Sequence, residues 1–168
     1  PIAGGEMSGL RVSSDTLYEG AHCIVTPTDK TDPFALKRIT ELWETVGMQV
    51  SVMDVKEHDF IFGAVSHLPH VLIFALMNTL GGLKSENYDR ITSFSGAGLR
   101  DITRIAASEP AMWRDICVSN KDSILYFLDL VQKSLGRLRS GIEQENGTLL
   151  TQQFKIANQH QLKLISKT

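Results

Sequence analysis

The chain has 168 residues, 42% of them hydrophobic, a length and composition that suit one ordinary domain, or one domain with a piece of another, around a real core. Its 17 basic and 19 acidic residues give a net charge of −2 and form no long runs, so neither a nucleic-acid-binding stripe nor a polybasic membrane patch is expected. The two cysteines, Cys23 and Cys117, are far apart and form no CxxC motif. This argues against a metal knuckle or a disulfide framework and favours reduced thiols in a cytoplasmic protein.

The opening third of the chain has the pattern of a strand, a helix and a second strand. Residues 21–26 and 48–53 have strand character, and residues 33–46 have helical spacing, with Thr31 or Asp32 as the N-cap. This is the right size for one crossover unit of a parallel sheet. Because two strands do not make a stable sheet alone, we expect the trailing end of a larger α/β domain.

From residue 54 onward the strand signal stops, and Asp54 can cap a long central helix that runs to about Leu80. Residues 60–80 are almost entirely apolar, and Pro69 is expected to kink the helix. The length would suit a membrane span. Polar side chains within the run make that costly, so we expect a soluble protein away from the membrane. These side chains are Ser66, His67, His70 and Asn78.

Further helices are predicted after a polar segment, residues 83–95. Residues 99–106 have one apolar helical face, and Pro110 opens a helix that continues until Asn146-Gly147, followed by a last helix over 148–165. The long helix carries a heptad seam, typical of packing against another helix in a bundle or a dimer. The seam consists of Ile124, Leu128, Val131, Leu135, Leu138 and Ile142.

Ser66 and His70 are four residues apart, so on a helix they share one face. A hydroxyl and an imidazole there could hold an anionic or hydroxylated ligand, but a core histidine bonded to a backbone carbonyl has the same pattern. A metal site built from His58, His67 and His70 is not expected, because on a straight helix His58 and His67 point in roughly opposed directions.

Residues 96–104, GAGLRDITR, form a glycine-rich loop that opens a helix, a geometry that can bind an anion. Arg100 and Arg104 follow one turn apart and could grip a carboxylate. Alternatively, these arginines are solvated and paired with Asp101 or Glu109. Nearby Trp113 could line a pocket, although an aromatic residue at a helix start is also typical of a core or an interface.

Five stretches of the chain together resemble the prephenate/arogenate dehydrogenase family of tyrosine biosynthesis. They occur in the family's order over residues 1 to about 120, and SHLPH and RIAASEPAMWRDI are the most specific motifs. The stretches are PIAGGEMSG, HCIVTPT, LWETVG, EHDFIFGAVSHLPH and TRIAASEPAMWRDI.

The resemblance implies a mainly α chain: the trailing βαβ piece of a truncated Rossmann-type nucleotide-binding domain, residues 1–53, then an all-helical dimerisation domain, residues 54–168. It implies NAD or NADP as cofactor, and prephenate or arogenate as substrate. The parent enzyme would decarboxylate prephenate oxidatively to 4-hydroxyphenylpyruvate, or arogenate to tyrosine. A homodimer is implied, with tyrosine as a possible feedback inhibitor.

The resemblance also assigns substrate-site residues, position by position. Arg104 resembles the arginine that grips a substrate carboxylate, and His70 and Ser66 resemble donors in the substrate pocket. Ser108 and Trp113 resemble residues that line the same pocket. Glu6 resembles the acid of the HPIAG-x-E motif, which contributes to the polar network of the pocket and to its pH response.

Two departures from the family pattern matter. Ala97 replaces a glycine of the usual GGGF, which puts a close backbone approach there in doubt. The family's catalytic histidine and glycine-rich dinucleotide loop would precede Pro1, so we expect a fragment that is itself inactive. A rival interpretation is a dimerisation and regulatory module that binds tyrosine. Another Rossmann-plus-helical dehydrogenase, such as a hydroxyacid dehydrogenase, would not explain SHLPH together with RIAASEPAMWRD.

Overall fold

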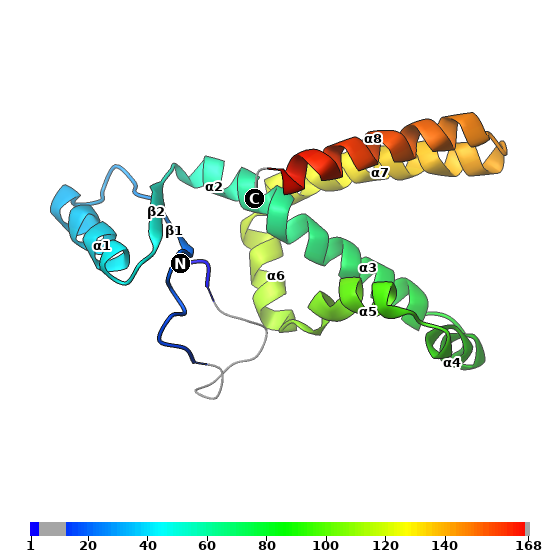
Figure 1. Ribbon diagram of the computed structural model, residues 1–168, viewed down its shortest axis with the longest axis horizontal. Coiled ribbons are helices and arrows are strands. Elements are labelled where there is room, and N and C mark those ends of the chain that lie inside the picture. The colour runs from blue at the N-terminus through cyan, green and yellow to red at the C-terminus, as the bar shows by residue number, and fades with distance from the viewer. Residues whose placement is uncertain (4–12, 167–168) are drawn as a thin grey trace. The chain divides into compact units, whose positions relative to one another are not determined.

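The computed structural model describes residues 1–3 and 13–166 (Figure 1). A short strand–helix–strand unit comes first, and helices follow to the end. The elements are β1 (His22–Val25), α1 (Pro33–Thr45), β2 (Gln49–Val52), α2 (Val55–Phe62), a π-helical turn (Gly63–His67), α3 (Leu68–Gly81), α4 (Ser85–Ser93), α5 (Ala97–Thr103), a 3-10 turn (Arg104–Ala107), α6 (Pro110–Ser119), α7 (Lys121–Glu143) and α8 (Gly147–Ile165). The predicted fold class, a βαβ piece followed by a mainly helical part, is confirmed.

The strands β1 and β2 pair in parallel, with Cys23 opposite Val50. The crossover helix α1 begins where expected, because the Asp32 carboxylate accepts a hydrogen bond from the Phe34 N–H at 2.9 Å. It ends at Thr45, and Gly47 just after its C-cap has a φ of +89°, in the left-handed region. A Cβ at this position would also lie 3.3 Å from Glu19 Cα, so glycine suits both the turn and the close approach.

The central helix is two α-helices, α2 and α3, joined by the π-helical turn. Asp54 caps α2 as predicted, accepting a hydrogen bond from the Glu57 N–H at 2.9 Å. The expected kink at Pro69 takes another form: the Leu68 N–H donates to the Gly63 oxygen, five residues back, so the ladder widens just before the proline. In a regular α-helix, a proline ring clashes with the carbonyl four residues earlier. The wider π-helical turn relieves this clash just before Pro69.

Two local predictions between α3 and α7 were wrong. The polar segment 83–95 contains a helix, α4, which begins at Ser85. Its N-cap residue Lys84 makes no side-chain capping bond, so the sequence has no capping signal for this helix. The helix predicted from Pro110 through the heptad seam is interrupted at Asn120, which ends α6 before α7 begins. Asn120 has φ −106° and ψ 38°, outside the helical values, because its side chain is engaged elsewhere.

The chain divides into two compact units, residues 1–124 and 125–168. In the second unit, α7 and α8 form a hairpin (Figure 1). The turn uses Glu145 at φ 50°, and the Asn146 side chain caps α8 by accepting from the Leu149 N–H at 3.0 Å. Within this hairpin the predicted seam is only partly covered: Val131 and Leu138 are half-buried, whereas Ile142 is 64% exposed.

The segment Val55–Gly81 is the one described stretch that is long and apolar enough to cross a membrane, by length and composition alone. Only 6% of its most apolar window is buried within the chain. A core helix of a soluble protein passes the same test, so this feature is weak evidence for a membrane. Most residues of its apolar run are half-buried by the rest of the described chain.

Candidate functional site

The π-helical turn and the first turn of α3 carry the polar residues of the SHLPH motif. His70 Nδ1 lies 2.9 Å from the backbone oxygen of Ser66. Because a carbonyl can only accept, Nδ1 carries a proton and donates it. This is the bond expected for a core histidine, but it uses only one ring nitrogen. Nε2 of the half-buried His70 has no hydrogen bond to the described part of the chain, so it can still contact a ligand.

Trp113 of α6 is the centre of an aromatic cluster that joins α6 to α3. Its ring stacks on His70 with centroids 3.8 Å apart and planes 20° apart. His67 and Phe74 meet the same ring edge-on, at centroid distances of 6.1 and 6.3 Å. We call these four residues the Trp113 cluster. Trp113 is only 7% exposed, which agrees with either predicted position, a core or a pocket wall.

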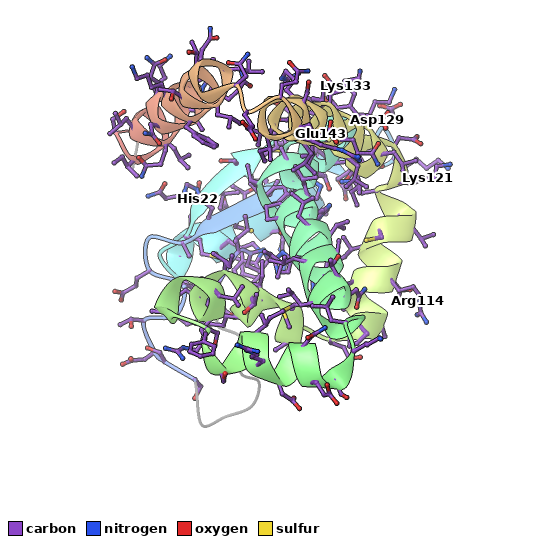
Figure 2. All side chains as sticks on the ribbon, turned by 90° about the vertical axis from the view of Figure 1, so that its right-hand side faces the viewer. His22, Arg114, Lys121, Asp129, Lys133 and Glu143 are labelled. Atoms are coloured by element: carbon purple, nitrogen blue, oxygen red, sulfur yellow. The ribbon has the colours of Figure 1, made fainter. Side chains whose placement is uncertain are left out.

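The Trp113 indole N–H is buried and has no hydrogen-bond partner among the described residues. On one side of α6, an open groove of about 440 Å³ runs past Trp113. Its walls are Val71, Phe74, Ala75, Asn78, Pro110, Trp113, Arg114 and Cys117. Arg114 itself points away from α6 into solvent, where its Nε lies 2.8 Å from Asp115 Oδ1 (Figure 2). The groove is therefore mainly apolar.

A second polar group lies on the other side of the cluster, where Asn120 meets His67. The Asn120 Nδ2 lies 2.6 Å from the Asp59 backbone oxygen and 3.0 Å from His67 Nδ1. Asp59 also places Oδ1 3.0 Å from His58 Nδ1. These residues line a cavity of about 440 Å³. Neither Asn120 nor Asp59 was predicted as a site residue from the sequence.

Burial lowers the pKa of His67 below its usual value, because a charged ring loses solvation there. The neighbouring His58 lowers that pKa further, Asp59 partly opposes the change, and His70 has a smaller lowering effect. His67 is therefore neutral over a wider pH range than a solvated histidine.

Arg104 and Ser108 lie at the two ends of the 3-10 turn, which packs against α3. Arg104 is exposed, a position from which a guanidinium can reach a ligand. The Ser108 hydroxyl donates to the Ile105 oxygen at 2.7 Å. That bond occupies its donor and leaves it as an acceptor.

The loop before α5 is closed by an arginine. Arg100 Nη1 donates to the Ser95 oxygen at 3.1 Å, so this arginine contacts a backbone carbonyl rather than the predicted partners Asp101 or Glu109. Glu109 instead accepts from the Ala111 N–H at 3.3 Å and caps α6. Ala97 is the first residue of α5, which has seven residues, and the Gly96 N-cap makes no side-chain hydrogen bond.

The structure thus brings His70, Trp113 and the Ser66 backbone together, and places Arg104 and Ser108 on a turn against the same helix. Glu6 lies outside the described residues. Asparagine is common at helix ends, which is the only local signal at Asn120, and that signal does not indicate its contacts with Asp59 and His67. Within residues 1–3 and 13–166, no three His, Cys, Asp or Glu side chains lie close enough to hold a metal ion.

Comparison with known proteins identifies the class to which this fold and cluster belong. Residues 1–52 match the description "Prephenate dehydrogenase, nucleotide-binding domain", and residues 54–156 match "Prephenate dehydrogenase, dimerization domain". The chain therefore belongs to the prephenate dehydrogenase family, and the resemblance found in the sequence is confirmed.

Individual relatives agree with this assignment. A prephenate dehydrogenase of Bacillus subtilis is 37% identical over 161 residues, covering 95% of this chain and 43% of the relative. A cyclohexadienyl dehydrogenase of Zymomonas mobilis is 33% identical over 164 residues, covering 98% of this chain and 56% of the relative. The chain thus spans about half the length of the curated relatives it matches.

Solved structures have the same fold. Prephenate dehydrogenase from Aquifex aeolicus, in complex with hydroxyphenyl propionate and NAD+, is 41% identical, with a TM-score of 0.86, covering 98% of this chain and 57% of that one. Synechocystis arogenate dehydrogenase is 24% identical, with a TM-score of 0.81 and coverage of 98% and 59%, and supports the fold alone.

Proposed function

We propose that this chain is part of a prephenate dehydrogenase, which oxidatively decarboxylates prephenate to 4-hydroxyphenylpyruvate in tyrosine biosynthesis, with NAD or NADP as the hydride acceptor. The observation that carries the proposal is the 41% identity to the Aquifex aeolicus enzyme, whose structure holds hydroxyphenyl propionate and NAD+. That compound has a phenol ring and a carboxylate, the two features of the product of this reaction.

The reaction needs a cationic anchor for the substrate carboxylates and a surface that orients the ring. Arg104 is proposed as the carboxylate anchor, because a guanidinium can bind a carboxylate through two parallel hydrogen bonds. His70 offers Nε2, which accepts a hydrogen bond in the neutral ring and donates one in the charged ring. The half-buried Ser66 adds a hydroxyl one turn away, and Trp113 holds the His70 ring in place through the stack.

The strand-to-helix turn in this chain does not fit a dinucleotide. A pyrophosphate binds at a glycine-rich turn between a strand and a helix. The turn from β1 to α1, residues 26–32, contains no glycine. We therefore propose that the cofactor phosphates bind to the part of the family's length that these 168 residues do not span. These residues alone are expected to transfer no hydride.

Calorimetric titration of the chain with 3-(4-hydroxyphenyl)propionate tests the substrate site without turnover. We expect Arg104→Ala to weaken binding about 10- to 100-fold, since hydrogen bonds to charged groups contribute about 1.5–3 kcal/mol. Arg137→Ala is the matched control, because Arg137 is an exposed arginine on α7 in the other compact unit. Equal affinity of the Arg104→Ala variant and the unchanged chain would contradict the proposed anchor.

We also propose that the helical part forms a homodimer. The match to a dimerization domain covers residues 54–156, from α2 into the first half of α8, and α7 exposes several large apolar side chains in the single chain. These are Leu125, Tyr126, Leu130, Leu135 and Ile142. Sedimentation equilibrium should give twice the chain mass of 18.6 kDa. A Leu135→Asp, Ile142→Asp double variant should shift the measured mass toward that of the monomer. A monomeric mass for the unchanged chain would contradict the proposal.

A regulatory module that binds tyrosine is the second candidate. Tyrosine shares its hydroxyphenyl group and a carboxylate with the compound bound in the Aquifex aeolicus structure. Titration with tyrosine, and with prephenate against arogenate, separates the candidates. Binding of tyrosine alone favours regulation, while binding of prephenate or arogenate identifies the substrate. A cytoplasmic location is proposed with this function, since both cysteines are free thiols.

A further inference from the structure

Asn120 contacts four structural elements, α6, α7, α2 and the π-helical turn. Asn120 ends α6, where its backbone N–H donates to the Ile116 backbone oxygen at 2.9 Å. Its backbone oxygen accepts from the Ile124 N–H of α7 at 3.2 Å. Its side chain reaches Asp59 of α2 and His67 of the π-helical turn. Asn120 is only 6% exposed, and it is the one buried polar or charged residue among those described.

The contacts of Asn120 determine where the proton of His67 lies. The Asp59 backbone oxygen, 2.6 Å from the amide, can only accept, so the atom facing it must be the NH2 group. The same NH2 group is 3.0 Å from His67 Nδ1 and directs its second hydrogen there. His67 Nδ1 must therefore present a lone pair. The single proton of the neutral ring then resides on Nε2.

The neighbouring histidines have the opposite arrangement. His70 donates from Nδ1 to the Ser66 oxygen, and His58 Nδ1 faces Asp59 Oδ1 at 3.0 Å, a carboxylate that accepts. His67 and His70 both meet the Trp113 ring. In the neutral rings, His67 offers a proton from Nε2, whereas His70 offers a lone pair on Nε2. Asn120 is the contact that makes them different.

We propose that Asn120 is a positioning residue, which holds the His67 ring neutral with its proton on Nε2. In the reaction of the proposed function, on which this role rests, His67 is then a fixed hydrogen-bond donor within the Trp113 cluster and does not act as a base. Burial, the largest cause of the lowered pKa of His67, also favours the neutral ring that this assignment requires. His58, Asp59, His70 and Asp115 are the other titratable groups around the ring or its cavity.

The test is nuclear magnetic resonance of the 15N-labelled chain, in which nitrogen shifts distinguish a protonated ring nitrogen from one with a lone pair. The His67 signals are assigned by their loss in His67→Gln. In the unchanged chain we expect the lone pair on Nδ1. In Asn120→Asp, a carboxylate replaces the donor, so the proton should move to Nδ1. The His67 titration midpoint should then rise by about 1 pH unit or more.

A second variant covers the case in which Asn120→Asp does not fold. Asn120→Ser removes the two-hydrogen donor and adds no charge, so the His67 midpoint should still rise, by less than in Asn120→Asp. Asn146→Asp and Asn146→Ser are matched controls, because Asn146 caps α8 in the other compact unit. They should leave the His67 signals unchanged.

A proton on His67 Nδ1 in the unchanged chain would overturn the proposal. So would a His67 spectrum that does not respond to either substitution at Asn120, as expected if Asn120 only braced the helix ends. The measurement needs no turnover. A chain with the predicted proton position that binds no hydroxyphenyl carboxylate would therefore reject the proposed function and keep the role of Asn120.

Discussion

The rings of His70 and Trp113 stack with their centroids 3.8 Å apart and their planes inclined by 20°. This contact joins the first turn of α3 to the first turn of α6, two segments far apart in the chain. It places the last histidine of SHLPH against the tryptophan of the RIAASEPAMWRDI stretch. The two most specific motifs of the family are thus one packed unit.

Substitutions of Trp113 should separate the packing of its ring from its N–H. Trp113→Ala should lower the free energy of unfolding by about 3–5 kcal/mol, because it empties a buried aromatic site. Trp113→Phe keeps an aromatic ring and removes an N–H that has no partner in the described structure, so the loss should stay below about 1.5 kcal/mol. Urea unfolding followed by circular dichroism measures both. Equal losses would show that the N–H makes a stabilising bond.

The Asp54 cap should contribute measurably to the central helix. Asp54→Ala removes the acceptor for Glu57 N–H and should cost about 1 kcal/mol. Asp122→Ala is the control: this aspartate also lies in the first turn of a helix, but its side chain is 96% exposed and its contact is an ion pair with Lys121. Its effect should stay within about 0.5 kcal/mol. A thermal unfolding comparison in which both variants lose the same stability would contradict the capping role.

Stability should fall in acid because of His67. Its pKa in the folded chain lies below the ordinary value of 6.5, so below that pH the unfolded chain binds more protons than the folded one. The free energy of unfolding should therefore decrease as the pH falls from 6.5 toward the folded pKa, and His67 should contribute no change above 6.5.

Urea titrations of unfolding between about pH 5.5 and 7.5, about one unit on either side of the usual histidine pKa, check this dependence. His67→Gln should make the acid-side decrease smaller, because the titrating ring is gone and the glutamine oxygen can still accept from Asn120. His160→Gln, an exposed position on α8, is the control. An unchanged pH dependence in His67→Gln would mean that other groups cause the decrease.

The elements predicted correctly from the sequence are those with local signals. Asp32 and Asp54 are good caps, Gly47 permits the left-handed conformation, and Pro110 suits a first helical turn, so each boundary follows from the residue itself. The β1–α1–β2 unit follows from strand and helix periodicity. None of these inferences needs a distant contact.

The features missed from the sequence depend on tertiary contacts. Asn120 interrupts a continuous helical pattern because its amide bonds to Asp59 and His67, which are 61 and 53 residues away. The wide turn before Pro69 and the stack on Trp113 likewise arise only when the helices pack. Spacing left both a ligand-binding and a structural role open for His70 and Arg104, and only the family resemblance assigned them to a substrate site.

The α7–α8 hairpin should respond in opposite ways to alanine at its two α7 glycines. Gly136 has open space where an alanine Cβ would lie, so Gly136→Ala should gain up to about 1 kcal/mol from helix propensity. At Gly141, a Cβ would lie 2.9 Å from Leu150 Cδ2 and 3.2 Å from its Cγ. Gly141→Ala should therefore be less stable than Gly136→Ala by about 1–3 kcal/mol.

A double-mutant cycle with Leu150→Ala shows whether that contact causes the difference. Truncating Leu150 removes the clashing atoms, so in that background Gly141→Ala should become as favourable as Gly136→Ala. The coupling between positions 141 and 150 should be about 1–3 kcal/mol, whereas Gly136→Ala and Leu150→Ala should be additive within about 0.5 kcal/mol. Thermal unfolding of the single and double variants and the unchanged chain measures both cycles. Additivity at Gly141 would mean that α7 and α8 do not approach each other there as closely as the structure places them.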